Sequence, residues 1–290
     1  MAAPTFDLQS HSRHSDGALA PAEVVAEAAR AGVELLALSD HDNVDGVAEA
    51  LEAGAREGVR VAPAVEITAI DGDHADLHVL GYLIDHTDAR LLERLAGYRA
   101  QREGRADRIV EACRELGLEV DDSVLEARAA QGKSIGRPHI AQAVFGHPAN
   151  AERMAAEGHG DFTSFLVAYL IEGAPAFVAR EGPSVAEAIT TVHEAGGLAV
   201  WAHPFWDIAG PEEVLEHVER FRGEGLDGVE CFYATHTREQ TELLADRCEA
   251  LGLLTTGSAD YHGPEHRQFR AFRTFETYGR EPRLGPIAEV

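Results

Sequence analysis

The chain has 290 residues, 45% of them hydrophobic, and a formal net charge of -25 at pH 7. This length can bury a large core, so it suits one barrel-sized domain with an insertion or two modest domains. The negative charge repels polyanions and argues against duplex nucleic acid as a partner. No segment is apolar for long enough to span a bilayer and no signal peptide is visible, so we expect a cytoplasmic protein without membrane contact.

The cysteines are few and widely spaced: Cys113, Cys231 and Cys248. An odd set without tight spacing argues against a disulfide framework or a zinc knuckle. We therefore expect buried, reduced thiols.

Short apolar runs alternate with helical patterns in the first third of the chain and again after residue 181. The expected strands are 5–8, 34–39, 60–65, 77–84, 198–202, 228–233 and 253–258. The expected helices are 21–30, 44–57, 185–195, 212–224 and 237–251. Strand, helix and strand at this spacing predict parallel β/α units with right-handed connections and about seven strands.

The alternation lapses between residues 88 and 180, where the sequence is helical and polar. We predict a β/α barrel over 1–87 and 181–290, and an inserted, mainly helical subdomain over 88–180. Arginines recur at every third position of this segment: Arg99, Arg102, Arg105 and Arg108. They form either a solvated face paired with acidic residues or a cap that offers positive charge to an anionic ligand.

Acidic residues and histidines gather where the expected strands end, which is where functional residues meet in parallel β/α barrels. They are His11, Asp16, Asp40, His41, Glu66, His203, Asp260 and His262, while His78 stands at the start of its strand and fits least. Carboxylates can bridge two ions, and imidazoles suit zinc, manganese or iron. Two ions about 3.5 to 4 Å apart can activate a water for displacement at phosphorus. The pattern therefore predicts a multinuclear metal site in a hydrolase.

Gln9 breaks this pattern. It stands two residues before His11 on an extended segment, so both side chains point to the same face. A histidine there would bind an ion together with His11, whereas an amide oxygen is a neutral and weaker donor.

Several motifs together resemble one family. DLQSHSRHSDG, LSDHD, the glutamate of VEIT, HVLGY, GRPHIA, AHP and SADYH are similar to the PHP (polymerase and histidinol phosphatase) family, specifically its stand-alone phosphoesterase branch. The resemblance covers most of the chain. It implies an α/β fold, a distorted seven-stranded TIM-like (β/α)7 barrel with the helical subdomain inserted. It also implies phosphate ester hydrolysis at a three-metal site that uses manganese, zinc or iron.

The same resemblance implies three ligand sets. They are Gln9, His11, Glu66 and Asp260; Glu66, His78 and His203; and Asp16, His41 and His262. The family pattern reads DLH where this chain reads DLQ, which affects only the first set. Our hypothesis is that the chain binds two divalent ions firmly and a third weakly or not at all.

Substrate-side candidates are Arg137 and His139 in GRPHIA and His236 in YATH. The guanidinium of Arg137 is a planar fork suited to phosphate oxygens. The resemblance implies that these residues reach the phosphate, with Arg137 and His236 taking part in catalysis. The alternative is that Arg137 pairs with an acid and His236 is simply exposed.

The leading function is therefore a metal-dependent phosphoesterase for small nucleotides: nucleoside bisphosphates, oligonucleotide ends or cyclic phosphates. A metal-dependent hydrolase of C–N or C–O bonds is one alternative, and an inactive metal-binding module is another. The metal, the exact ester and the oligomeric state stay open at this point.

Overall fold

The computed structural model describes residues 4–130 and 135–290. The chain divides into two units. Unit 1 comprises Met1–Ala96 and Pro183–Val290, and unit 2 comprises Gly97–Gly182.

Unit 1 is built on seven strands that pair in sequence order. They are β1 (Phe6–Asp7), β2 (Leu35–Leu38), β3 (Arg60–Asp71), β4 (His74–Tyr82), β5 (Leu198–Trp201), β6 (Gly228–Tyr233) and β7 (Leu254–Ser258). The edges meet where the Leu8 amide donates to the Gly257 carbonyl (3.1 Å) and where Ser10 bridges Tyr261. The predicted seven-stranded α/β barrel is confirmed.

Strand β4 corrects the expectation of parallel pairing throughout, because it runs antiparallel to both β3 and β5. His78, in β4, pairs with Thr68 in the second half of β3. Its carbonyl accepts a hydrogen bond of 3.0 Å from the Ala202 amide, just past the end of β5. Because β4 is reversed, its middle residue, His78, lies level with the end of β5. His78 therefore joins the other candidates although it does not stand at the end of its own strand.

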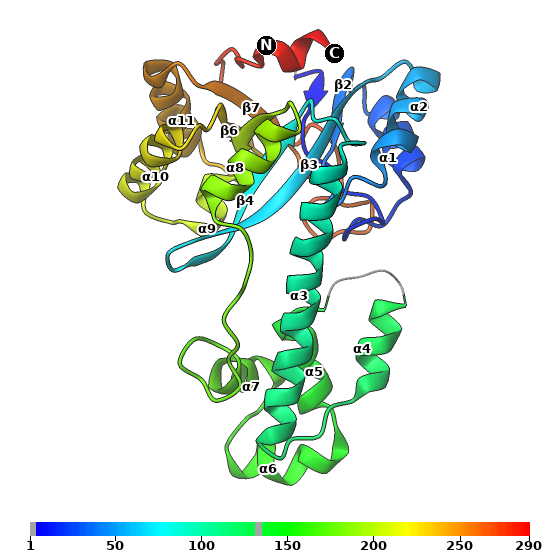
Figure 1. Ribbon diagram of the computed structural model, residues 1–290, viewed down its shortest axis with the longest axis vertical. Helices are drawn as coiled ribbons and strands as arrows, with labels where there is room; N and C mark the ends of the chain where they lie inside the picture. Colours follow the sequence, from blue (N-terminus) through cyan, green and yellow to red (C-terminus); the bar gives the residue numbers. More distant parts are fainter. Residues whose placement is uncertain (1–3, 131–134) are drawn as a thin grey trace. The chain divides into compact units, whose positions relative to one another are not determined.

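Helices of unit 1 lie around the outside of the sheet (Figure 1). They are α1 (Pro21–Arg30), α2 (Val47–Glu57), α8 (Val185–Glu194), α10 (Pro211–Gly223) and α11 (Arg238–Leu251). Four of the five agree with the predicted ranges to within one residue at each end. The second begins three residues later than predicted because Asn43 turns the chain, its side chain accepting from the Asp45 amide at 2.8 Å.

The first two helices show how the barrel is covered. Their small and β-branched residues leave an apolar face against the strands below. The buried cluster contains Val24, Val25, Ala28, Ala50 and Ala53 from the helices with Leu36, Leu38 and Val61 from β2 and β3. This packing fixes the strand ends from which the site is built.

Unit 2 has helices and no strand among its described residues. Helix α3 (Ala89–Glu115) begins in unit 1 and continues into unit 2, followed by α4 (Asp122–Ala129), α5 (Arg137–Phe145), η1 (Pro148–Asn150), α6 (Ala151–Ala156) and α7 (Phe162–Tyr169). Unit 2 has its own buried cluster, which includes Ile109, Ile140 and Phe165. Arg105 Nε donates to the Val178 carbonyl (3.0 Å) and Arg108 pairs with Glu181 (3.3 Å).

All three cysteines are free and buried, as predicted, and the sulfurs of Cys231 and Cys248 lie 3.7 Å apart. None of the helices within the described ranges has the length and apolarity needed to cross a membrane.

Gly257 allows β6 and β7 to approach closely at an irregular point of the ladder. The register shifts between Glu230 and Phe232, and Phe232 pairs with Gly257. A Cβ on Gly257 would lie 2.5 Å from the carbonyl oxygen and 2.6 Å from the Cβ of Phe232. The neighbouring backbone leaves no room for a larger residue.

We expect Gly257→Ala to lower the free energy of unfolding by about 1–3 kcal/mol, the usual cost of overpacking. Gly223→Ala is the control, because a Cβ there meets nothing within 4 Å. In a helix that change is neutral or stabilises by up to about 1 kcal/mol. Urea denaturation of the two variants checks this, and equal midpoints would contradict it.

Candidate metal centre

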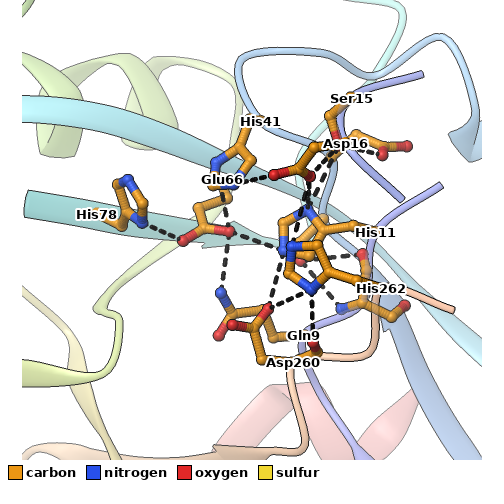
Figure 2. Close-up of polar contacts among 12 residues, drawn as sticks. Gln9, His11, Ser15, Asp16, His41, Glu66, His78, Asp260 and His262 are labelled. Atoms are coloured by element: carbon orange, nitrogen blue, oxygen red, sulfur yellow. Dashed lines mark hydrogen bonds and ion pairs between the residues drawn. The ribbon is translucent and has the colours of Figure 1, made fainter. Parts of the chain in front are cut away.

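The carboxylate of Glu66 lies at the centre of the candidate site (Figure 2). It projects from the middle of β3 and is 0% exposed. Its Oε1 lies 2.7 Å from His78 Nδ1 and 3.2 Å from His203 Nε2. Its Oε2 lies 3.1 Å from His11 Nε2 and 3.6 Å from His41 Nδ1. One carboxylate thus has imidazoles on both of its oxygens, the arrangement expected of a bridging ligand.

Asp16 gathers a second group beside the first. Its carboxylate lies 3.7 Å from both His11 and His41 and 3.5 Å from His262. One ligand atom from each of these four residues lies within 4.8 Å of all the others, and the same holds for the trio of His41, Glu66 and His78. His41 belongs to both groups, so the two possible ion positions adjoin.

Asp260 and Gln9 close the remaining side of the site. Asp260 Oδ1 lies 3.1 Å from His11 Nε2. Gln9 donates from Nε2 to Glu66 Oε2 (2.9 Å), and its Oε1 accepts from the Ser258 hydroxyl (3.4 Å). Gln9 therefore presents an N–H to the central carboxylate in place of a ligand atom.

The structure brings all nine metal candidates together through contacts of 3.7 Å or less. They are Gln9, His11, Asp16, His41, Glu66, His78, His203, Asp260 and His262.

Four buried polar atoms of the site form no well-aligned hydrogen bond with the described residues, although ion-pair contacts of 3.1 to 3.6 Å reach three of them. They are His11 Nε2, His41 Nδ1, His203 Nδ1 and Asp260 Oδ1. A buried polar atom without a hydrogen bond costs about 1–3 kcal/mol. Nitrogen and carboxylate donors left free in one place fit divalent ions such as zinc, manganese or iron.

Electrostatics make the centre of the site anionic and divide its imidazoles into two kinds. Burial lowers the pKa of His11 and His78, but the facing carboxylates outweigh it and raise both well above the usual value, so these rings must lose a proton when an ion binds. Burial opposes ionisation of Glu66, but the surrounding imidazoles outweigh it and hold its pKa well below the usual range. Burial lowers the pKa of His41 to about 4. At neutral pH Glu66 is therefore an anion, and His41 is a neutral imidazole with a free lone pair, as a metal ligand must be.

Asp40 holds the loop that carries His11 and Asp16. It accepts hydrogen bonds of 2.7 Å from the Ser12 amide, the Ser12 hydroxyl and the Ser15 hydroxyl. The loop after β1 is therefore tied to the end of β2.

Two supporting residues in β6 were missed by the sequence analysis. The Tyr233 hydroxyl donates to Asp260 Oδ2 (2.8 Å), and Glu230 accepts from the His203 amide (3.0 Å). Burial raises the pKa of Glu230 to about 8. The available signal was an acidic residue inside the otherwise apolar run 228–233, which is unusual unless that residue has a partner.

The backbone is strained at the site. Asp42, His203 and Asp260 have φ angles of 47°, 28° and 55°, in the left-handed region that favours glycine. Each such residue costs about 1–3 kcal/mol. Two of the three are candidate ligands, so the fold supports strain where it aims side chains at the site.

His236 is buried at 6% exposure, so the alternative that it is simply exposed is wrong. Its Nδ1 lies 3.1 Å from the Cys231 carbonyl, and because a carbonyl only accepts, Nδ1 carries the proton. Burial lowers its pKa to about 4. His236 is therefore neutral, and its Nε2, which is buried without a partner among the described residues, is a hydrogen-bond acceptor.

Arg137 and His139 lie in unit 2, at the start of α5. His139 Nδ1 accepts from the Gly136 amide (3.0 Å) and so caps that helix. The guanidinium of Arg137, the first residue of α5, forms no hydrogen bond or ion pair with the described residues, so the expected alternative of pairing with an acid is not observed there.

Known sequences similar to this chain are phosphate-processing enzymes. The family model described as PHP domain matches residues 7–112. A 3',5'-nucleoside bisphosphate phosphatase of Chromobacterium violaceum is 32% identical over 89% of this chain and 87% of its own length. A 5'-3' exoribonuclease of Haemophilus influenzae is 30% identical over 89% and 90%. A phosphoribosyl 1,2-cyclic phosphate 1,2-diphosphodiesterase of Eggerthella lenta is 30% identical over 96% and 97%.

Solved structures agree with the sequence relatives. A Chromobacterium violaceum protein described as an amidohydrolase, with bound sulfate, superposes with a TM-score of 0.73 at 29% identity, covering 98% of this chain and 93% of its own. A Bifidobacterium adolescentis protein, inferred to be a metal-dependent phosphoesterase, gives 0.71 at 26% identity, covering 99% and 96%. With a relative 32% identical over most of both chains, this chain belongs to the PHP domain family.

Proposed function

We propose that this protein, a metal-dependent phosphoesterase, hydrolyses phosphate esters of small nucleotides: nucleoside bisphosphates, oligonucleotide ends or cyclic phosphates. The observation that carries the proposal is the buried Glu66 carboxylate with His78 and His203 on one oxygen and His11 and His41 on the other. A buried carboxylate surrounded by imidazoles is the set of ligands expected for two metal ions bridged by that carboxylate.

Divalent ions held there would neutralise phosphate oxygens and lower the pKa of a coordinated water. We propose that Glu66 with His78 and His203 holds one ion, and that Asp16, His41 and His262 hold a second. The third set needs Gln9 as a ligand. Its N–H points at Glu66 Oε2 (2.9 Å), so we propose that this position binds an ion weakly or not at all.

The chain's own residues orient these ligands and meet the substrate. Tyr233 fixes Asp260, and the Glu230 carboxyl group fixes the His203 backbone. Hydrogen bonds of this kind set the direction of a ligand and are part of a metal site's affinity. We propose that the buried Nε2 of His236 accepts a hydrogen bond from a hydroxyl group of the substrate, and that the Arg137 guanidinium anchors the phosphate.

The relatives support the substrate class without choosing within it. Their names include a nucleoside bisphosphate phosphatase, an exoribonuclease and a cyclic phosphate diphosphodiesterase. The net charge of -25 favours small substrates, because repulsion grows with the number of phosphates.

Protein loaded with manganese, zinc or iron is expected to release phosphate from at least one of four substrates: adenosine 3',5'-bisphosphate, adenosine 5'-monophosphate, a cyclic phosphate or a short RNA. Glu66→Gln keeps the shape of the side chain but removes its charge. The rate of phosphate release should fall at least about 100-fold, because loss of a residue that only supports a metal ligand already costs up to about 100-fold. Glu213→Gln is the control, since Glu213 also pairs with a histidine, His74, at 3.0 Å, but is exposed. Phosphate release by the wild type and both variants is the measurement.

Absence of phosphate release with all three metals, despite bound metal, would favour the inactive binding module. Cleavage of amides without phosphate release would favour the C–N hydrolase.

Gln9→His is expected to raise the content of tightly held ions from two to three per chain, because an imidazole lone pair replaces an N–H facing Glu66. Metal analysis after dialysis is the measurement, and the larger rise in melting temperature on adding metal is a second. Gln101→His, an exposed change in α3, is the control. Three tightly held ions in the wild type would contradict the proposal.

Arg137→Ala is expected to raise KM for the phosphate ester about 10- to 100-fold, the value of one charged hydrogen bond. Arg114→Ala removes an exposed arginine of the same unit that pairs with Asp122 (2.6 Å), and should leave KM unchanged. Steady-state kinetics distinguish the two, and equal KM values in the two variants would remove Arg137 from the substrate site.

A further inference from the structure

Trp206 is a large aromatic side chain left half in water beside the site. It lies in α9 (Pro204–Asp207), which begins directly after His203, and is 50% exposed. It is the one aromatic among the large exposed hydrophobic side chains in the described part of unit 1. An indole held in place while exposing so much apolar surface indicates a binding face.

The ring of Trp206 connects to the metal centre through two buried aromatics. Its centroid lies 5.6 Å from Phe269 and 6.4 Å from Tyr233. Phe269 lies 5.6 Å from the His262 ring, and the Tyr233 hydroxyl donates to Asp260 at 2.8 Å. A ligand on the open face of Trp206 is therefore one aromatic layer away from the side chains that would hold ions.

Trp206, Phe269 and Tyr233 thus form an aromatic wall beside the metal centre. Further aromatic side chains extend this wall. Phe205 and Tyr233 lie 5.5 Å and 5.4 Å from the His236 ring. The exposed His266 stacks on Phe269 at 5.3 Å, with 10° between the planes. The wall thus offers flat faces next to the place where the ester is proposed to bind.

Base rings suit such a wall for two reasons. Each nucleobase has a face that stacks on an aromatic side chain, whatever its hydrogen-bonding pattern. A neutral base is also not repelled by a chain with a net charge of -25. The sequence relatives do not decide whether the substrate carries a base, because a nucleoside bisphosphate phosphatase at 32% identity and a phosphoribosyl cyclic phosphate enzyme at 30% match almost equally well.

We propose that Trp206 stacks on the nucleobase of the substrate, so that this enzyme selects esters that carry a base over sugar phosphates that lack one. This inference rests on the proposed phosphoesterase function and adds a specificity-determining residue to it.

The kinetic test compares adenosine 3',5'-bisphosphate with an analogue in which hydrogen replaces the base. Trp206→Ala is expected to raise KM for the nucleotide about 5- to 100-fold, the value of one stacked base. KM for the baseless analogue and kcat for both should stay within about twofold, since only binding of the base is lost. Trp206→Phe should restore most of the affinity, and Phe162→Ala, which removes a 40% exposed aromatic of unit 2, should change neither substrate.

A binding test separates this inference from the proposed function. The chain has two tryptophans, Trp201 fully buried and Trp206 exposed. Adenosine 5'-monophosphate should quench the fluorescence of the metal-loaded wild type, whereas ribose 5-phosphate should not, and Trp206→Phe should abolish the quenching. Equal quenching by the two ligands, or an equal rise in KM for both substrates, would overturn the role of Trp206. Absence of turnover by the wild type would overturn the phosphoesterase proposal. Stacking of a base on Trp206 would then be tested by the fluorescence measurement alone.

Discussion

The buried negative charge of Glu66 is the constraint on which the rest of the site depends. Removing a carboxylate from water costs several kcal/mol, and the loss is recovered only when the charge has close partners. Here the partners are imidazoles that come from the ends of β1, β2 and β5 and from β4. Because no single β/α unit supplies them, the barrel must close before the charge is stabilised.

Barrel closure also explains why supporting residues come from strands without a candidate ligand. Strand β6 contributes Tyr233 and Glu230, which hold Asp260 and the His203 backbone. The close approach at Gly257 lets β6 and β7 align for these contacts. The positive φ angles of His203 and Asp260 show that the backbone is held in costly conformations at the same edge. Packing of the outer helices against the barrel compensates for the free energy of these strained residues. Part of the folding free energy thus serves to orient the candidate ligands.

Specificity has a different physical origin from the charge at the centre. Metal ions held by carboxylates and imidazoles interact with the phosphate group of any ester in the same way. This agrees with relatives named for action on bisphosphates, RNA and cyclic phosphates. Discrimination requires contacts with the part of the substrate that does not react. The aromatic wall that ends at Trp206 offers such contacts, and it is continuous with the centre through Tyr233 and Phe269.

The sequence by itself predicted the seven strands and most helix boundaries, because apolar periodicity is a local signal. Strand-end chemistry indicated most of the candidate ligands, and the family resemblance supplied Gln9 and the full set of nine. It could not determine the antiparallel course of β4, since pairing direction depends on which strands become neighbours. Only the tertiary structure decided that His78 lies level with Ala202 and that the Gln9 amide points its N–H at Glu66. It alone brought Trp206, Phe269 and Tyr233 together from three separate segments. Such contacts follow from how the strands pair and the loops after them fold, and no local pattern in the chain encodes that.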